Sequence, residues 1–245
     1  MLMDVLQNLK MHGACQAMVN LKPTQESEKL LLHILQAELE YKKQRASQRR
    51  TTKAQFPVTK EWSDLDLTVN SSIEFDKIRE LGNNGEFIEE RKNLCLMGQP
   101  GTGKTHTLIA LGRQLCRKGM NVRFITACAL VNALEDAKMK HELSKCMQQF
   151  TNPDLLIIDE LGFVPFSENG ARLLFDVFSS RYERGSIAIS TNLSYEKWIQ
   201  IFGSMDLTAA LIDRFTHKCL IYTYQGESYR FLEAARKKKR GGKSS

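Results

Sequence analysis

The sequence predicts an α/β domain built on a mostly parallel sheet and preceded by a small region of helices. Two observations predict this class. Five short stretches rich in apolar and β-branched residues alternate with longer helical stretches. A glycine-rich string follows the first of these stretches directly and leads into a helix. At 245 residues, the chain is long enough for one such domain and a small appendage.

The N-terminal region is predicted to be helical over residues 1–45, because apolar side chains recur there at steps of three and four residues. The periodicity fails over residues 47–60, which indicates a linker. We therefore expect a helical domain with a basic linker (1–62), a main domain (63–235) and a basic flexible tail (236–245).

Each apolar stretch of the main domain is predicted to be a strand, and the stretches between them are long enough for crossover helices. Such connections favour parallel pairing, because parallel strands cannot be joined by a tight turn. The expected strands are residues 94–97, 122–126, 155–159, 187–191 and 219–224.

The formal charge of +7 is distributed unevenly along the chain. Residues 41–60 hold seven bases and no acid, residues 236–245 hold six bases and no acid, and the remaining residues carry a net charge of −6. Blocks of this kind favour contact with a polyanion such as nucleic acid, although a solvated helix face and a frayed tail are the alternatives. The candidate contacts in the first block are Lys42, Lys43, Arg45, Arg49 and Arg50.

Several classes of protein are excluded by the composition. The sequence contains no run of 18 apolar residues, which a membrane-spanning helix would require. The N-terminus lacks the apolar core of a signal peptide. The six cysteines contain no C-x-x-C pair, so we expect reduced cysteines, no zinc site and a cytoplasmic location.

The glycine-rich string has the pattern G-x-x-x-x-G-K-[ST] of a phosphate-binding loop. Glycines let the backbone N–H groups point inward around a phosphate, and the following helix directs its positive end at the anion. Lys104 is expected to hold the β- and γ-phosphates, and the Thr105 hydroxyl to bind Mg²⁺. The string is Gly98-Gln99-Pro100-Gly101-Thr102-Gly103-Lys104-Thr105.

Two carboxylates follow four apolar residues at the end of the third expected strand. Asp159 is predicted to hold a Mg²⁺-bound water, and Glu160 to orient or deprotonate the water that attacks the γ-phosphate. A kinase has little use for the glutamate, because its acceptor replaces the water. The pair therefore favours ATP hydrolysis over phosphoryl transfer.

Two further polar residues are candidates for the same reaction. Asn192 follows the fourth expected strand and can reach between the γ-phosphate and the water, or it can cap the helix that begins near Ser194. Arg214 lies on a helix before the last strand and can project into the phosphate site of a neighbouring subunit. Alternatively, Arg214 pairs with Asp213 or Asp206 in its own chain.

Taken together, these motifs resemble the AAA+ ATPases, and more narrowly the IstB-like insertion-sequence helper ATPases, which are relatives of DnaC-type helicase loaders. The resemblance covers residues 75–231. It rests on the strings Asn93–His106, Asp154–Gly162, Arg181–Ser186, Thr191–Leu193, Asp213–Phe215 and Gly226–Arg230, together with Trp198.

This resemblance implies an ATP-hydrolysing homo-oligomer, ring or helical, that assembles on double-stranded DNA and helps a DDE-type transposase during target selection. A replicative helicase loader and a nucleotide-switched DNA-binding scaffold without hydrolysis are the alternatives. It also implies DNA contacts at Lys138, Lys140 and Lys145, although acids alternate with these bases and a solvated face is equally consistent.

The same resemblance implies that His106 belongs to the nucleotide site and that the usual C-terminal helical lid is missing, since about 21 residues follow Tyr224. Arg230 is the candidate to replace the lid arginine at the nucleotide, and the alternative is a surface arginine packed on Tyr229.

Overall fold

The computed structural model of the chain describes residues 2–20, 24–65, 75–226, 228, 229 and 231. Arg230 and the basic tail from residue 236 lie outside these described residues. The chain divides into two compact units, Met1–Arg49 and Arg50–Ser245.

Helices make up the first unit, as the apolar periodicity predicts. They are α1 (Leu2–Asn8), α2 (His12–Asn20) and the larger part of α3 (Gln25–Ala54). The apolar side of α1 is buried, whereas Leu30 and Ile34 of α3 are exposed.

Helix α3 continues beyond the point where the sequence predicts a linker. It ends at Ala54, which is fully buried in the second unit. Arg50 lies one turn earlier and donates from Nε to the main-chain oxygen of Cys116 at 2.9 Å. The last turn of α3 is therefore held by packing and by a hydrogen bond to the main chain, and neither produces an apolar periodicity in the sequence.

The second unit contains a five-stranded sheet in which every pairing is parallel, as predicted. The strand order is β2-β3-β4-β1-β5. Consecutive strands in the chain are joined through helices, so their carboxyl ends meet at one edge of the sheet. The strands are β1 (Asn93–Gly98), β2 (Val122–Thr126), β3 (Leu155–Leu161), β4 (Ser186–Thr191) and β5 (Cys219–Tyr224).

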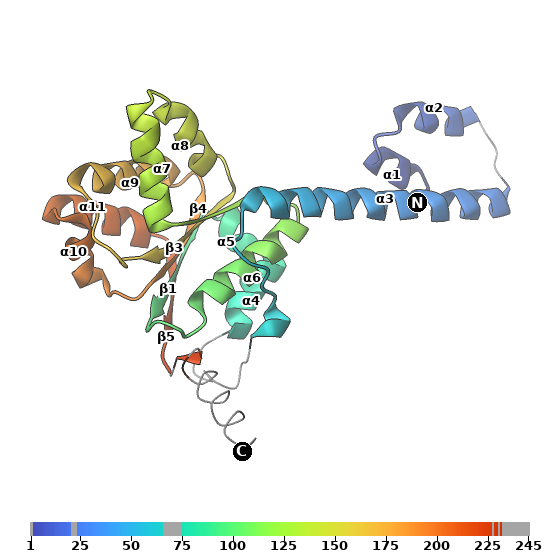
Figure 1. Ribbon diagram of the computed structural model, residues 1–245. Coiled ribbons are helices and arrows are strands. Elements are labelled where there is room, and N and C mark those ends of the chain that lie inside the picture. The colour runs from blue at the N-terminus through green and yellow to red at the C-terminus, as the bar shows by residue number, and fades with distance from the viewer. Residues whose placement is uncertain (1, 21–23, 66–74, 227, 230, 232–245) are drawn as a thin grey trace, which may run out of the picture. The chain divides into compact units, whose positions relative to one another are not determined.

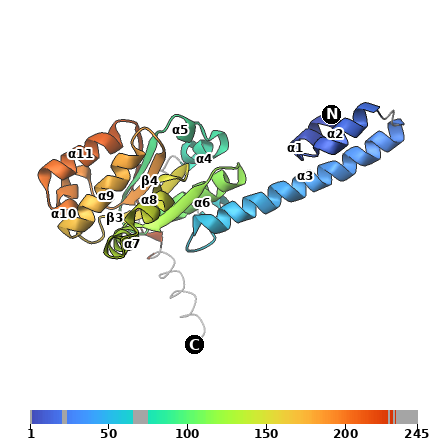
Figure 2. The same ribbon diagram turned by 90° about the horizontal axis from the view of Figure 1, so that it is seen from above.

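Helices cover both faces of this sheet (Figures 1 and 2). The side chains of α4, α5 and α6 pack with Leu94, Leu96 and Ile157 on one face. Ala54 of α3 and Trp62 of η1 belong to the same cluster, whereas the side chains of α7 to α11 and η2 pack on the other face. In chain order, the helical elements are η1 (Trp62–Asp64), α4 (Phe75–Asn84), α5 (Glu86–Glu89), α6 (Lys104–Arg117), α7 (Ala127–Met139), α8 (Leu143–Thr151), α9 (Glu168–Arg181), η2 (Tyr195–Trp198), α10 (Ile199–Phe202) and α11 (Met205–Thr216).

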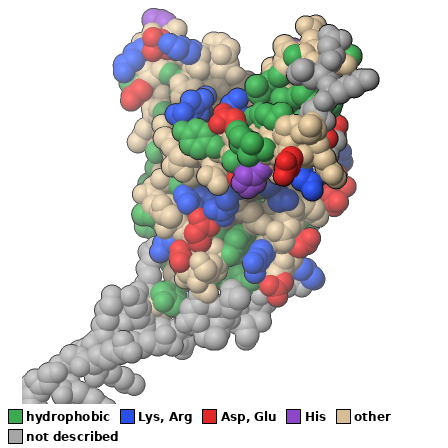
Figure 3. Space-filling model, turned by 90° about the vertical axis from the view of Figure 1, so that its right-hand side faces the viewer, with side chains coloured by type: hydrophobic (Ala, Val, Ile, Leu, Met, Phe, Trp, Pro, Cys, Tyr) green, Lys and Arg blue, Asp and Glu red, His purple; other side chains and the backbone are tan. Residues whose placement is uncertain are grey.

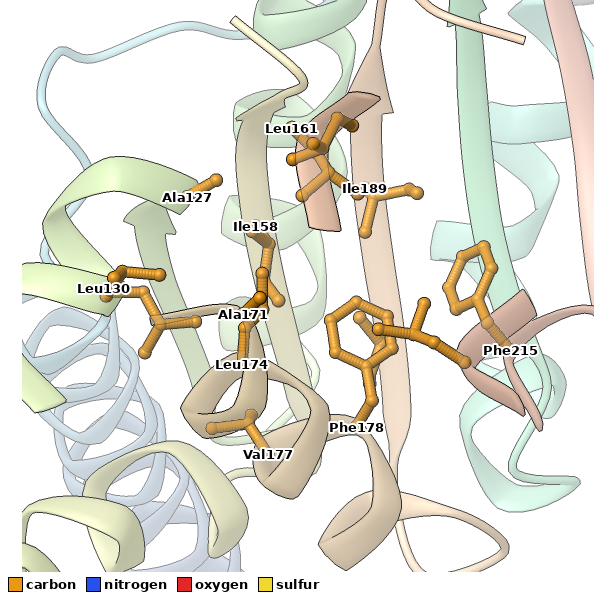
Figure 4. Close-up of a cluster of buried hydrophobic side chains, with 14 of the residues drawn as sticks. Ala127, Leu130, Ile158, Leu161, Ala171, Leu174, Val177, Phe178, Ile189 and Phe215 are labelled. Atoms are coloured by element: carbon orange, nitrogen blue, oxygen red, sulfur yellow. The ribbon is translucent and has the colours of Figure 1, made fainter. Parts of the chain in front are cut away.

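The larger core lies under α7, α9 and α11 and includes Leu130, Leu174, Phe178 and Phe215 together with Ile158 of β3 (Figure 4). Strands buried on both faces explain why the strand sequences read as almost continuous apolar runs. The predicted absence of a helical lid concerns the segment after β5, most of which lies outside the described residues.

A buried arginine, Arg181, lies at the amino-terminal edge of the sheet and holds several main-chain carbonyl groups there. Arg181, the last residue of α9, is 1% exposed. Burial lowers the pKa of its guanidinium to about 10. Its two terminal nitrogens donate to five main-chain oxygens, those of Phe150, Thr151, Pro153, Asp154 and Ser186. One side chain thus connects the end of α8 and the turn before β3 to the first residue of β4.

We predict that Arg181→Ala destabilises the second unit by at least about 3 kcal/mol, because several buried carbonyl groups lose their donor. Arg184→Ala, three residues later and exposed, should change the free energy of unfolding by less than about 0.5 kcal/mol. Urea unfolding followed by circular dichroism measures both. Equal effects of the two substitutions would show that the Arg181 hydrogen bonds are not the stabilising feature.

Candidate functional site

The phosphate loop joins β1 to α6 at the carboxyl edge of the sheet, and its glycines are required by its backbone. Gly98, Gly101 and Gly103 have φ values of 148°, 81° and 99°, a region that side chains disfavour. A Cβ on Gly98 would lie 2.1 Å from the main-chain oxygen of Tyr224, and one on Gly101 would lie 2.1 Å from Oγ of Ser228. The backbone at Gly98 and Gly101 therefore passes too close to β5 and the segment after it for a residue with a side chain at these two positions.

Lys104, the first residue of α6, folds back over this loop. Its Nζ donates to the main-chain oxygens of Gly98 and Gln99 at 2.7 and 2.8 Å, and the residue is only 9% exposed. Thr102 Oγ1 also donates to the oxygen of Gln99, at 2.8 Å. The ammonium group is thus held inside the concave side of the loop, where a phosphate would meet it.

The two carboxylates lie on the neighbouring part of the same edge. Asp159 is 3% exposed, and its Oδ1 accepts a hydrogen bond from Oγ1 of Thr105 at 3.0 Å. This contact joins β3 to the start of α6 across 54 residues of sequence. A hydroxyl and a carboxylate side by side are oxygen ligands of the kind that Mg²⁺ prefers. Among the described residues, no group of three or more His, Cys, Asp or Glu side chains forms another candidate metal site.

Glu160 has an unusual backbone and an exposed side chain. Its φ of 59° is left-handed, which costs a residue with a side chain about 1–3 kcal/mol. The pairing of β3 with β4 is irregular between Ile158 and Leu161, so Glu160 lies in a bulge. Its N–H donates to Oγ of Ser190 at 2.9 Å, and the bulge turns the two successive carboxylates into different environments, one buried and one exposed.

Asn192 lies at the same edge as the carboxylates. It is exposed and follows β4, the strand between β3 and β1. The residue in the N-cap position of η2 is Ser194, so Asn192 does not cap that helix. The structure thus brings together the loop, both carboxylates and Asn192 at one edge of the sheet.

Arg214 is not brought to this edge. Its guanidinium lies 4.9 Å from the ring centre of Phe175, and it donates to the main-chain oxygen of Ala210 at 3.2 Å. Together with Asn93, Gly185 and other residues, it lines a small hollow at the amino ends of β1, β4 and β5. The described contacts of Arg214 are therefore with Phe175 and its own helix, and not with Asp213 or Asp206.

His106 lies in the first turn of α6 but its ring faces the preceding segment. Its Nε2 is 2.9 Å from the main-chain oxygen of Glu61. Hydrogen bonds from Arg117 and Arg113 hold the pKa of the Glu61 carboxyl down at about 2 against the opposing effect of burial. Since the ring is engaged there, the main-chain N–H at the start of the helix is the part of His106 that can meet a phosphate.

The candidate DNA contacts fall into two groups. In the first unit, Lys42 lies 3.5 Å from Glu38, and the Arg45 guanidinium lies over the ring of Tyr41. Lys43 and Arg49 are exposed. In the second unit, Arg50 is half-buried and bonded to Cys116, as described above. Basic side chains lie among acidic and hydrophobic ones on the face shown in Figure 3.

The α7–α8 group is similarly mixed. Lys140 and Lys145 line a shared hollow with Asp136 and Glu142, and Lys138 donates to the side chain of Asn169.

No helix among the described residues is long and apolar enough to span a membrane, and all six cysteines are free.

Ser190 and Tyr229 are site residues that the motifs do not identify. Ser190 interrupts the apolar run of β4 just before Thr191, which is the only sequence signal for it, and its hydroxyl also donates to Oδ1 of Asp159. The N–H of Tyr229 donates to the oxygen of Gly101 at 3.0 Å, so the segment after β5 lies against the phosphate loop. Nothing in the sequence pattern alone indicates this last contact.

Comparison with known sequences gives a consistent family. The model of the IstB-like ATP binding protein family matches residues 4–238. A relative from Geobacillus stearothermophilus, named as an ATP-binding protein of insertion sequence IS5376, is 36% identical over 203 residues, which cover 83% of this chain and 80% of that protein. A second, named for IS21 of Pseudomonas aeruginosa, is 35% identical over 199 residues, which cover 81% and 75%.

Solved structures share the fold at lower identity. The DnaC helicase loader has a TM-score of 0.51 at 22% identity, covering 61% of this chain and 86% of that one. DnaI has a TM-score of 0.55 at 16% identity, covering 69% and 89%. A DNA replication initiation factor has a TM-score of 0.53 at 22% identity, and the match spans 67% of this chain but only 49% of that one. At these identities the likeness shows a shared fold alone.

Proposed function

The chain belongs to the IstB-like ATP binding protein family, and from this premise we propose that it is a Mg²⁺-dependent ATPase that assembles on double-stranded DNA and helps the transposase of its insertion sequence. The observation that carries the proposal is the contact of Thr105 with Asp159 beside the phosphate loop. This contact joins a hydroxyl to a buried carboxylate next to the loop over which Lys104 folds, and it supports a site for a metal-bound phosphate there.

ATP is bound chiefly through its phosphates in this proposal. The main-chain N–H groups of residues 98–106 surround the β- and γ-phosphates, and the Lys104 ammonium exchanges the oxygens of Gly98 and Gln99 for phosphate oxygens. Thr105 and Asp159 would hold Mg²⁺, which supplies charge neutralisation at the β- and γ-phosphates when bound.

Hydrolysis requires a positioned water, and Glu160 is the group that orients and deprotonates it. The water oxygen bonds to the γ-phosphorus, the bond from that phosphorus to the bridging oxygen breaks, and ADP and phosphate leave. Asn192 follows the strand between the loop and Glu160, from where its amide can bond to the water or to the γ-phosphate. Arg230 remains a proposed nucleotide contact.

We predict that Glu160→Gln lowers kcat by about 10²-fold or more while ATP affinity stays within about threefold, because the base is lost and the phosphate contacts remain. Lys104→Ala should instead lose ATP binding. The matched control is Glu168→Gln, an exposed glutamate of α9 that should leave both quantities unchanged. Steady-state phosphate release and equilibrium binding of a fluorescent ATP analogue measure the two effects. Wild-type turnover in Glu160→Gln would remove Glu160 from the role of base.

Arg214 completes the site of a neighbouring subunit in this proposal. It lies at the amino edge of the sheet, whereas its own phosphate loop lies at the carboxyl edge. A cation at that position can reach a γ-phosphate only across an interface between copies of the chain, in a ring or helical homo-oligomer. Assembly on DNA would then stimulate hydrolysis, because DNA brings neighbouring subunits together.

Mixing Lys104→Ala subunits with Arg214→Ala subunits is therefore expected to restore part of the DNA-stimulated activity that each variant lacks alone. A mixed interface pairs an intact loop with an intact arginine. Arg172→Ala, which removes an exposed arginine from α9, should be active without mixing. Phosphate release is measured across mixing ratios, with co-assembly checked by light scattering. No recovery in co-assembled mixtures would contradict action in trans.

We propose three regions, namely a helical domain with a basic linker (1–62), an ATPase domain (63–235) and a basic tail (236–245). DNA is proposed to bind through contacts between its phosphates and the basic residues of 1–62. Lys138, Lys140 and Lys145 provide the second proposed surface. The insertion-sequence names of the relatives favour transposition over helicase loading, for which the solved structures supply only a shared fold. The proposed place of action is the bacterial cytoplasm.

Replacing Lys42, Lys43, Arg45 and Arg49 with Gln should flatten the dependence of log affinity on log salt by about 0.9 for each DNA phosphate that the variant no longer neutralises. Arg50 is kept, because it bonds to Cys116. The control replaces Lys118, Arg172, Arg184 and Lys197 with Gln, which removes the same charge from exposed sites of the second unit. Fluorescence anisotropy with duplex DNA gives both slopes. Identical slopes in the two variants would show that the first basic block makes no phosphate contacts.

A further inference from the structure

Ser190 connects the two carboxylates of the site through one hydroxyl group. Its Oγ accepts from the N–H of Glu160 at 2.9 Å and donates to Oδ1 of Asp159. Oδ1 also accepts from Thr105 at 3.0 Å. A continuous chain of hydrogen bonds therefore runs from the Glu160 backbone through Ser190 and Asp159 to the first turn of α6.

The geometry of the bulge explains why a side chain is needed here. Ile158 pairs with Ile189 and Leu161 pairs with Thr191, so the two residues between Ile158 and Leu161 have no regular partner on β4. Ser190 supplies the acceptor that the strand backbone does not provide for Glu160. Because Ser190 is 2% exposed, water has little access to take its place.

The hydrogen bond from the Glu160 N–H to Ser190 also helps to maintain the left-handed backbone conformation of Glu160. A residue with a side chain keeps such a conformation only where its surroundings enforce it. The Ser190 hydroxyl fixes the Glu160 N–H on one side, and Gly162, at φ 96°, lets the chain turn back on the other. The direction in which the exposed Glu160 carboxylate leaves the sheet is thus set by Ser190.

Ser190 also determines which oxygen of Asp159 faces the nucleotide. Two hydroxyl groups bond to Oδ1, so Oδ2 is the oxygen that can accept from a metal-bound water. Without Ser190, the carboxylate can rotate about its terminal torsion, which has a broad energy well.

We propose that Ser190 is a positioning residue for hydrolysis, which holds the Glu160 backbone and the Asp159 carboxylate in their working orientations. The proposal rests on the ATPase function proposed above. Ser190 itself contacts neither the γ-phosphate nor the water, so its loss should slow the reaction without removing the phosphate contacts. Its loss should also lower the affinity for Mg²⁺, because Asp159 is a residue that would hold the ion.

The test compares Ser190→Ala, Ser190→Thr and Ser186→Ala, each first shown to unfold at the wild-type urea midpoint within error. Threonine keeps the hydroxyl and suits a strand. Ser186 is a buried serine of the same strand, at its other end, where its hydroxyl contacts the main-chain oxygen of Phe87 at 3.3 Å. It is the matched control for loss of a buried hydroxyl from β4.

Ser190→Ala is expected to lower kcat by about tenfold to a hundredfold, with KM for ATP within about threefold of wild type. The Mg²⁺ concentration for half-maximal rate should rise several-fold. Ser190→Thr should recover most of kcat, and Ser186→Ala should match wild type. Wild-type kcat and Mg²⁺ dependence in Ser190→Ala, an equal loss in Ser186→Ala, or no recovery in Ser190→Thr would each overturn the proposal.

A binding measurement that does not depend on turnover tests the role of Ser190 independently of the proposed ATPase function. Binding of a fluorescent ATP analogue is titrated with Mg²⁺ in wild type and in Ser190→Ala. If the wild type binds the analogue but releases no phosphate on DNA, the ATPase function fails, and this titration alone decides the role of Ser190. A higher Mg²⁺ requirement in Ser190→Ala supports the role, and superimposable titrations overturn it.

Discussion

Parallel strands end at a common edge, and the order β3-β4-β1 places three different polar segments side by side at that edge. The phosphate loop follows β1, Asn192 follows β4, and the two carboxylates end β3. These segments are about 30 to 90 residues apart in the chain, so only the pairing of the strands brings them together. Every candidate role at the nucleotide depends on this order, because β1 and β3 flank β4 and the contact of Thr105 with Asp159 spans that strand.

The two edges of the sheet are held in different ways. At the amino edge, Arg181 binds five carbonyl groups and connects the end of α8 and the turn before β3 to the first residue of β4. At the carboxyl edge, single hydroxyl groups from Thr105 and Ser190 hold a buried carboxylate and a left-handed residue. The first arrangement stabilises the fold, whereas the second maintains a locally costly geometry that suits a reactive site.

Most of the fold could be predicted from the sequence, because its signals are local. Apolar runs indicated all five strands, and the glycine-rich loop and the carboxylates at the end of β3 appeared as short motifs. The missed features depend on long-range packing. Arg50 reaches Cys116 across 66 residues, His106 reaches Glu61 across 45, and Ser190 reaches Asp159 across 31. No periodicity or spacing encodes such contacts, and the same hydroxyl or guanidinium on a surface would have looked identical in the sequence.

The central claim is that Lys104, Thr105 and Asp159 surround the phosphates of one nucleotide. An experimental structure with Mg²⁺ and a non-hydrolysable ATP analogue tests it most directly. The account predicts that Lys104 Nζ leaves the oxygens of Gly98 and Gln99 for the β- and γ-phosphates, with the metal ion between the Thr105 hydroxyl and a water held by Asp159. A nucleotide bound elsewhere, or bound while Lys104 keeps both main-chain oxygens, would contradict the account.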